Sequence, residues 1–302
     1  MFAFAIWDAP RRRLFVARDR IGIKPLYYTF ADGRFLFGSE IKALLAHPAV
    51  ERDVDAEALY HYLSYYTTPP PSTMFRGISK LAAGHFMLVD ERGDATVRRW
   101  WDAADAPVPA AELLAEEDEA AAEVERLLSA AVDERLMADV PFGVFLSGGV
   151  DSSAITALVR KMHGGALRTF SVGYADAPEH DELGPARDVA RLLDTEHHEI
   201  VIDQQDLVSY VPDLIHAQDE PLADWVCIPL HYVSKLVRDS GTIVALVGEG
   251  SDEQFAGYRH YQRYDRLSRG AWAAYGRLPG WARRNAHRLG DPALRRMRLP
   301  RE

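Results

Sequence analysis

The sequence is short of cysteine and of long apolar runs, and each shortage excludes a class of protein. Cys227 is the one cysteine among 302 residues, so a disulfide framework is excluded and a reducing compartment is favoured. No apolar run approaches the roughly 18 residues that a transmembrane helix needs. Residues 1–7 are apolar but lack the basic segment and the cleavage site of a signal peptide. We therefore predict a cytoplasmic protein with no membrane partner.

Positive charge is also in short supply. The formal net charge is −10 at pH 7, which argues against nucleic acid as a partner. The segment from Arg259 to Arg301 is strongly arginine-rich, against this overall balance, and its amphipathic spacing favours a solvated helical face over a phosphate-binding patch. With 48% hydrophobic and 26% charged residues, the composition is that of a globular protein long enough for two domains.

The two halves of the chain have different patterns. Residues 1–102 alternate polar and apolar positions between turns, which predicts β-structure, with strands that include 13–18, 23–30 and 34–38. Residues 103–112, which contain two prolines, are the predicted linker. In residues 113–302 a long helix over 113–137 is followed by alternating strands and helices, which predicts a doubly wound parallel sheet. We therefore predict an α/β protein with a β-rich first domain.

The stretch 142–153, Phe-Gly-Val-Phe-Leu-Ser-Gly-Gly-Val-Asp-Ser-Ser, predicts a buried strand, a glycine loop and the start of a helix. Gly148 and Gly149 are expected to take positive φ and turn backbone N–H groups toward a ligand. Because the helix start adds unpaired N–H donors and the positive end of the helix dipole, an anion is expected there. There is no Gly-Lys-Ser/Thr, which excludes a Walker A loop.

Asp151 lies in this loop, where a carboxylate beside a phosphate would be repulsive unless a divalent cation bridges the two. Asp151 is therefore a predicted Mg²⁺ ligand. The alternative is an ordinary glycine-rich turn in which Asp151 and Ser152 cap the helix.

A second loop, Gly248-Glu249-Gly250-Ser251-Asp252-Glu253, follows an apolar strand and brings three carboxylates together. Clustered carboxylates repel one another unless they share a cation or a proton. In a doubly wound sheet this loop, the first loop and Val172-Gly173 share the rim at the carboxyl ends of the strands. We predict Asp252 as a second Mg²⁺ ligand that faces Asp151 across a pyrophosphate.

The string 147–153 resembles the pyrophosphate loop of the N-type ATP pyrophosphatases, which cleave ATP to AMP and pyrophosphate. Together with the second loop and two upstream motifs, residues 18–28 and 38–44, it makes the chain similar to glutamine-hydrolysing asparagine synthetase. That family joins a class II glutamine amidotransferase domain to an ATP-pyrophosphatase domain. The resemblance extends to about residue 258.

The resemblance implies ATP and Mg²⁺ as cofactors, with aspartate and ammonia or glutamine as the other partners; a homodimer is compatible with it. Glu249 would help to form β-aspartyl-AMP, which ammonia converts to asparagine and AMP. The implied ATP-binding residues are Leu146, Val172, Val247 and Gly248 around adenine and ribose, and Ser147, Gly148, Gly149, Asp151 and Ser152 around the pyrophosphate.

The sequence departs from the family at both ends. The family's glutaminase uses an N-terminal cysteine as nucleophile, whereas this sequence begins Met1-Phe2, and Cys227 falls in a predicted apolar helix as a core residue. We expect a chain truncated at both ends, with the C-terminal part of the glutaminase domain in 1–102 and the N-terminal part of the ATP-pyrophosphatase domain in 113–302. Such a chain should not hydrolyse glutamine; a natural truncation and an incomplete gene reading are both open.

Two other functions stay open. A related amidotransferase could act on a sugar acid, a peptide or a β-lactam precursor, and a non-catalytic truncation could bind ATP without chemistry. A metal site at Glu196-His197-His198-Glu199 is disfavoured, because a strand sends successive histidines to opposite faces.

Overall fold

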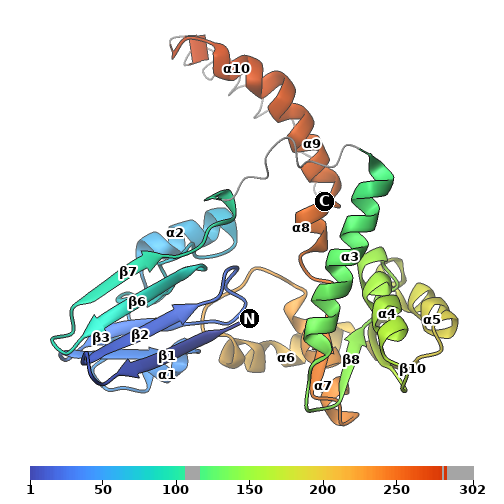
Figure 1. Cartoon of the computed structure of the whole chain (residues 1–302), viewed down its shortest axis with the longest axis horizontal. Coiled ribbons are helices and arrows are strands. Elements are labelled where there is room, and N and C mark those ends of the chain that lie inside the picture. Colours follow the sequence, from blue (N-terminus) through green and yellow to red (C-terminus); the bar gives the residue numbers. More distant parts are fainter. Residues whose placement is uncertain (106–115, 281, 284–302) are drawn as a thin grey trace.

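The computed structural model describes residues 1–105, 116–280 and 282–283, which form an amino-terminal unit of two sheets and a carboxy-terminal unit around one sheet (Figure 1). The amino-terminal sheets are antiparallel, as their hairpin turns and alternating patterns predict. The first has the order β1-β2-β6-β7 and the second β4-β3-β5. Their strands are β1 (Ala3–Asp8), β2 (Arg13–Arg18), β3 (Tyr27–Ala31), β4 (Arg34–Gly38), β5 (Ile78–Lys80), β6 (His85–Asp90) and β7 (Ala95–Arg99).

The core of this unit lies between its two sheets. Val16 and Met87 of the first sheet pack with Leu26 and Leu81, which border the strands of the second. The second sheet also packs against α1 (Ile41–Leu45), whose apolar residues join Ile78 of β5. A second helix, α2 (Ala56–Tyr65), begins at Asp55, which accepts hydrogen bonds from the N–H groups of Glu57 and Ala58 at 2.9 Å. The unit therefore has a sheet–sheet–helix order.

The carboxy-terminal unit is built on a four-stranded parallel sheet with the order β10-β9-β8-β11. This confirms the α/β class with a parallel sheet. Its strands are β8 (Phe142–Phe145), β9 (Arg168–Tyr174), β10 (Glu196–Ile202) and β11 (Val244–Leu246). Its helices are α3 (Glu117–Leu136), α4 (Val150–Met162), α5 (Leu183–Leu192), α6 (Gln204–Ala217), α7 (Cys227–Asp239), α8 (Ser251–Phe255), α9 (Arg259–Leu267) and α10 (Ala273–Arg277), with the short 3₁₀ helix η3 (Pro178–His180) and the π-helix η4 (Ser268–Trp272). The 3₁₀ helix η1 (Ala103–Asp105) directly follows β7.

Helices cover both faces of the parallel sheet. Val144 of β8 packs with α4 and α3 on one face, while Phe170 of β9 packs with Val233 and Val237 of α7 on the other. Strands that are buried on both faces read as nearly continuous apolar runs, which is why the β8 segment could be recognised in the sequence. The sheet is therefore doubly wound.

The order of the strands creates a switch point between β8 and β11. The chain moves from β8 outward to β9 and β10, and then returns through α6 and α7 to β11 on the opposite side of β8. In doubly wound sheets, ligands bind in the crevice outside the carboxyl ends of the two strands at such a point. The loops that follow β8 and β11 are the two glycine-rich loops of the sequence.

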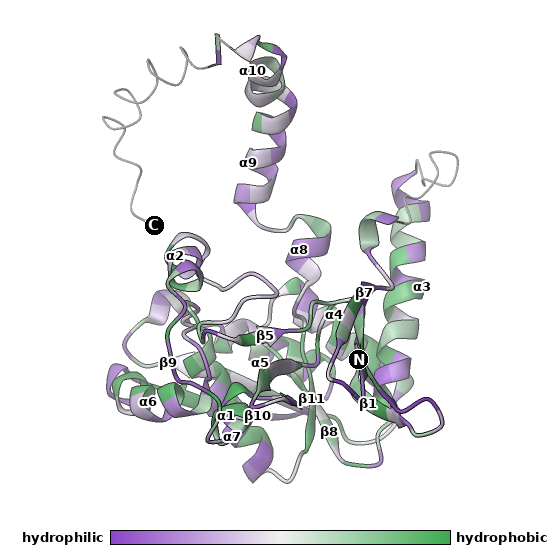
Figure 2. Ribbon diagram, turned by 90° about the vertical axis from the view of Figure 1, so that its left-hand side faces the viewer, coloured by the Kyte–Doolittle hydropathy of each residue, from purple (hydrophilic) through white to green (hydrophobic). Residues whose placement is uncertain are grey.

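The last described helices, α9 and α10 with η4 between them, project from the sheet-based unit (Figure 1). Figure 2 shows α9 mainly in the purple of hydrophilic residues, in keeping with the exposure of nearly all its residues. Within the part of the chain that the structure describes, no helix combines the length and the apolar character needed to cross a membrane.

Three sequence expectations about elements need correction or completion. The strand expected at 23–30 begins only at Tyr27, because the N–H groups of Ile23 and Lys24 are bound to the Asp19 carboxylate, each at 3.0 Å. The short strand β5 was not predicted. Residues 113–115 of the expected long helix, and the 106–112 portion of the expected linker, lie outside the described residues.

Candidate nucleotide-binding site

The loop after β8 turns sharply at Gly148, whose φ is +81°. A Cβ atom at this position would lie 2.6 Å from the Ala186 nitrogen and from the Pro185 Cβ at the start of α5. Glycine is therefore required both by the backbone angle and by the close packing against α5. Gly149, in contrast, has a φ of −69°, so the expectation of positive φ at both glycines is wrong for the second.

Helix α4 begins directly after this loop with Gly149 as its N-cap. Among the described residues, no side chain makes a capping hydrogen bond at this helix start. The alternative in which Asp151 and Ser152 cap the helix is therefore wrong. Ser152 instead fixes the loop: its Oγ accepts a hydrogen bond from the Ser147 nitrogen at 3.2 Å and donates to the Gly149 carbonyl at 3.3 Å. The first-turn N–H groups are left for an anion, as at other helix starts that bind phosphate.

Hydroxyl groups crowd this helix start. The Oγ atoms of Ser147 and Ser152 lie 3.0 Å apart, and the Ser147 Oγ also accepts from the Gly149 nitrogen at 3.2 Å. The Oγ of Ser153 is buried and has no hydrogen-bond partner among the described residues. Because buried polar atoms are nearly always paired in native proteins, an unpaired hydroxyl at a helix start fits a site that binds a phosphate group.

The loop after β11 approaches this helix start through Gly248. A Cβ atom on Gly248 would lie 3.2 Å from the Ser152 nitrogen and 3.3 Å from the Asp151 Cβ. A side chain at this position would therefore cover one of the first-turn N–H groups of α4. Gly250, with a φ of +91°, is the N-cap of α8, the helix that carries Asp252.

The two loops bring carboxylates of different chain segments together. Burial raises the pKa of Asp151, and the negative charges of Asp252 and Glu253 raise it further. Ionised together, these groups repel one another, which is the situation that a divalent cation relieves. The structure thus brings Asp151 and Asp252 to the same site.

These side chains suit a Mg²⁺ ion that is also bound by phosphate, rather than a metal ion bound by protein side chains only. Among the residues described, no group of three or more histidine, cysteine, aspartate and glutamate side chains is placed to hold a metal ion. Mg²⁺ usually takes one or two carboxylates and completes its shell with water and substrate phosphates. Asp151 and Asp252 would supply those two carboxylates beside the helix start.

The structure also places the remaining residues of the expected site. Glu249 and Val247 are exposed on the β11 loop, and Val172 is half-buried in β9. Leu146 is 1% exposed and packs with Ala186 and Ala190 of α5. Its backbone N–H binds the Phe170 carbonyl at 2.9 Å, and its carbonyl accepts from the Ser171 hydroxyl.

One residue beside the carboxylates was missed in the sequence. The Tyr258 hydroxyl donates to Glu253 Oε1 at 3.3 Å. Burial raises the pKa of Tyr258, and the charges of Glu253, Asp252 and Glu249 add to this effect. The sequence carried no signal for this contact beyond the position of a tyrosine shortly after the acidic loop.

Two other candidates have ordinary structural contacts. Cys227 is half-buried at the first position of α7, where its thiol donates to the Asp224 carbonyl at 2.8 Å, so the expectation of a core cysteine is wrong. In β10, His197 Nδ1 lies 2.9 Å from Thr169 Oγ1, whereas the His198 ring stacks on Phe170 with centroids 5.2 Å apart. The two imidazoles therefore have separate environments.

Comparison with known proteins assigns a family to each part of the chain. The Asparagine synthase family matches residues 123–301, and the Glutamine amidotransferase domain matches residues 1–101. Since the first match covers more than half of the chain, the protein belongs to the asparagine synthase family.

Several curated relatives match most of this chain. Asparagine synthetase [glutamine-hydrolyzing] 1 of Bacillus subtilis is 37% identical over 87% of this chain and 40% of its own length. Asparagine synthetase [glutamine-hydrolyzing] 3 of the same organism is 36% identical over 90% of this chain and 45% of its own length. Amidase chyE of Penicillium rubens is 33% identical over 88% of this chain and 41% of its own length. The chain thus spans less than half the length of these three relatives.

A solved structure, the NH3-dependent NAD synthetase from Campylobacter jejuni, covers 40% of this chain and 54% of that chain with a TM-score of 0.29 and 14% identity. So weak a likeness supports no conclusion about this protein.

Proposed function

We propose that this protein takes part in ATP-dependent amidation, in which a carboxylate is activated as its adenylate and then receives ammonia. Aspartate is the proposed acceptor and asparagine the product. One observation carries the proposal: Gly248 of the β11 loop lies against the exposed start of α4, at the switch point where the β8 loop turns on Gly148.

The chemistry proceeds by two displacements. A carboxylate oxygen of the acceptor attacks the α-phosphorus of ATP, the bond from that phosphorus to the bridging oxygen of the β-phosphate breaks, and pyrophosphate leaves. Ammonia then attacks the acyl carbon, AMP leaves with the oxygen that linked it to the acyl group, and the amine loses a proton to give the amide. The first displacement is helped by groups that stabilise the charge on the departing pyrophosphate.

Named parts of this chain fit these roles. The N–H groups at the start of α4 and the hydroxyls of Ser147 and Ser152 would bind the pyrophosphate. Asp151 and Asp252 would hold Mg²⁺, which neutralises charge on the phosphates when bound. Glu249, exposed on the rim, would contact the reacting acyl group, and Leu146, Val172, Val247 and Gly248 would surround adenine and ribose.

The family relationship also supports two domains with different tasks. We propose residues 1–102 as part of a glutaminase domain, 103–112 as a linker and 113–302 as part of the synthetase domain. We propose the cytoplasm as the location of the protein. A homodimer is compatible with the proposed function.

A related acceptor is the second candidate. Amidase chyE, with its different name, is 33% identical, so the fold serves relatives that are not named asparagine synthetase. Measuring pyrophosphate release with aspartate and with sugar acids or short peptides separates the two. Pyrophosphate release with aspartate but not with sugar acids or short peptides supports asparagine synthesis.

Replacing Asp151 by asparagine tests the proposal most simply. Without this carboxylate the Mg²⁺ ligand set is incomplete, so we expect pyrophosphate release to fall by about 100-fold or more. ATP binding, measured by calorimetry, should weaken much less, since the helix start and the hydroxyls are unchanged.

The matched control is Asp188→Asn, an identical chemical change on α5 at a side chain that is 72% exposed. It should leave pyrophosphate release unchanged. If the wild-type chain binds ATP but releases no pyrophosphate with any acceptor, the protein is an ATP-binding protein without this chemistry, and the proposal fails.

A further inference from the structure

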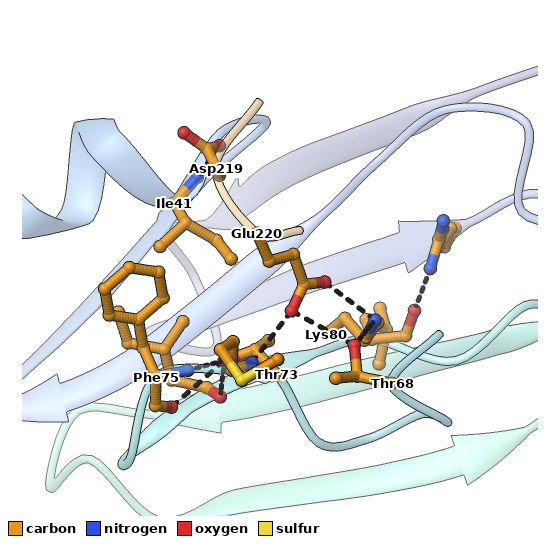
Figure 3. A network of polar contacts seen from close by, with 11 residues as sticks. Ile41, Thr68, Thr73, Phe75, Lys80, Asp219 and Glu220 are labelled. Atoms are coloured by element: carbon orange, nitrogen blue, oxygen red, sulfur yellow. Dashed lines mark hydrogen bonds and ion pairs between the residues drawn. The ribbon is translucent and has the colours of Figure 1, made fainter. Parts of the chain in front are cut away.

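The two units are joined by a pair of adjacent carboxylates that no sequence motif singled out. Asp219 and Glu220 lie on the segment between α6 and α7 of the carboxy-terminal unit, and both reach into the amino-terminal unit (Figure 3). Their partners come from α1, from β5 and from the loop that precedes β5.

Asp219 holds the beginning of α1. Its carboxylate accepts hydrogen bonds from the backbone N–H groups of Ile41, through Oδ2 at 2.5 Å, and Lys42, through Oδ1 at 3.2 Å. The Lys42 ammonium lies 2.9 Å from Asp219 Oδ1 and donates to the Ala217 carbonyl at 3.1 Å. Because α1 has no capping side chain of its own, the other unit supplies its cap.

Glu220 holds the loop before β5 and the strand itself. One carboxylate oxygen accepts from the Lys80 ammonium at 2.9 Å, and the other accepts from the Met74 nitrogen at 2.8 Å and from the Thr68 hydroxyl at 3.0 Å. The Lys80 ammonium also donates to Thr68 Oγ1 at 2.8 Å. The Lys80 and Glu220 side chains are 13% and 15% exposed, so this is a largely buried, fully paired ion pair rather than a surface contact.

The same segment then continues to the rim of the nucleotide site. Five residues after Glu220, the Trp225 ring lies 6.5 Å from that of Tyr174 at the carboxyl end of β9. Directly beyond it, α7 packs across β9 and β10. Residues 219–226 therefore run from the contacts with the amino-terminal unit to the carboxyl end of β9, where Trp225, 69% exposed, lies beside Tyr174.

We propose that Asp219 and Glu220 are positioning residues that link the amino-terminal unit to the rim of the nucleotide site, so that pyrophosphate release depends on contact between the units. The partners of the pair are groups of the amino-terminal unit, and in this proposal the pair acts by holding residues 221–226. This inference rests on the proposed function, but its structural half can be tested without it.

The first test is hydrogen exchange followed by mass spectrometry on the whole chain. In Asp219→Asn and Glu220→Gln, exchange should quicken about tenfold at the amides of Ile41, Lys42 and Met74, because each loses a charge-assisted hydrogen bond. Exchange should also quicken at the amides of Val226, Cys227 and Ile228, whose N–H groups are bound to Asp224 and Trp225. Asp239→Asn, at a carboxylate that is 58% exposed on α7, should leave both regions unchanged. Unchanged exchange at Val226, Cys227 and Ile228 in the two variants overturns the proposal.

The second test is kinetic. Both variants should lower kcat for ammonia-dependent pyrophosphate release by about fivefold or more while the Kd for ATP stays within about twofold, since the bound phosphates are not touched. Lys80→Met should lower kcat as Glu220→Gln does. Lys80→Arg, which keeps the cation, should retain most of the wild-type kcat. A kcat equal to the wild-type value despite faster exchange at Ile41 and Met74 overturns the link to catalysis.

The two proposals fail in different ways. A wild-type chain that releases no pyrophosphate contradicts the proposed function, while exchange at Val226, Cys227 and Ile228 still decides whether the pair positions the rim. Normal pyrophosphate release in every variant contradicts the positioning role alone.

Discussion

Asp19 holds a tight turn of the amino-terminal unit with one buried carboxylate. It is 4% exposed and accepts hydrogen bonds from the backbone N–H groups of Phe2 at 3.1 Å and of Ile23 and Lys24 at 3.0 Å each. Burial alone would raise the pKa of Asp19, but these N–H donors outweigh it and lower the pKa below the ordinary 3.8. The carboxylate thus stabilises the folded state in its ionised form.

Asp19→Asn should therefore destabilise the protein by about 2–4 kcal/mol at neutral pH. Because the folded-state pKa is depressed, the contribution of the ionised group is complete above the unfolded pKa and is lost as the pH falls through the folded one. The difference in unfolding free energy between wild type and variant should be constant from about pH 8 to pH 5 and shrink below about pH 4. Urea unfolding across this range measures it, with Asp188→Asn as the control; a gap that widens on acidification contradicts the assignment.

At the scale of single residues, sequence reasoning succeeded where a residue type has a narrow use. Gly148 could be assigned because a glycine between a strand and a helix signals a sharp turn, and the structure has a φ of +81° there. The role of Asp151 as a Mg²⁺ ligand stays a prediction. Asp19 carried no such signal, since the N–H groups that it binds belong to the backbone and leave no trace in the residue pattern. For the same reason the strand expected at 23–30 was drawn too long.

Among the secondary-structure elements, the β8 loop and α5 depend on each other. The backbone of Gly148 lies so close to Pro185 and Ala186 that no Cβ atom fits, and the alternation of strands and helices predicted only that the loop lies on the rim. The contact with α5 came from the structure, because it joins segments far apart in the sequence.

Gly148→Ala should disturb both elements at once. The methyl group would meet the Ala186 nitrogen at 2.6 Å in a backbone conformation that alanine disfavours, so we expect a loss of about 2–4 kcal/mol in unfolding free energy and a marked loss of ATP binding. Gly184→Ala is the control in the first turn of α5, where the new methyl has no atom within 4 Å; it should change stability by less than about 1 kcal/mol. Equal effects of the two substitutions would contradict the packing argument.

Across the whole molecule, the interface between the units was the least predictable feature. Glu220 and Lys80 are 140 residues apart, and adjacent carboxylates before a proline look like an ordinary end of a helix. The division into two differently patterned halves could be predicted, because strand and helix periodicities change at the predicted linker. The way in which the halves meet depends on pairs of residues that only the three-dimensional structure identifies.

Lys80→Met should destabilise the whole molecule, because it leaves Glu220 without its cation in a largely buried place. We expect a loss of about 2–4 kcal/mol, somewhat less than for a fully buried pair. Lys161→Met is the control: that lysine is 72% exposed and lies 3.4 Å from Glu125, so its removal should cost no more than about 1 kcal/mol. Thermal unfolding compares the two variants. Similar shifts in Tm would show that the buried Lys80–Glu220 pair stabilises the protein no more than the exposed pair does.

The measurement that bears most directly on the central claim follows the oxygen atoms of the acceptor. Aspartate labelled with heavy oxygen in its side-chain carboxylate is incubated with ATP, Mg²⁺, ammonium and the protein, and the products are analysed by mass spectrometry. If the carboxylate attacks the α-phosphorus, one heavy oxygen should appear in the AMP and none in the pyrophosphate. Heavy oxygen in inorganic phosphate together with ADP, or no transfer of label at all, would contradict activation by adenylation.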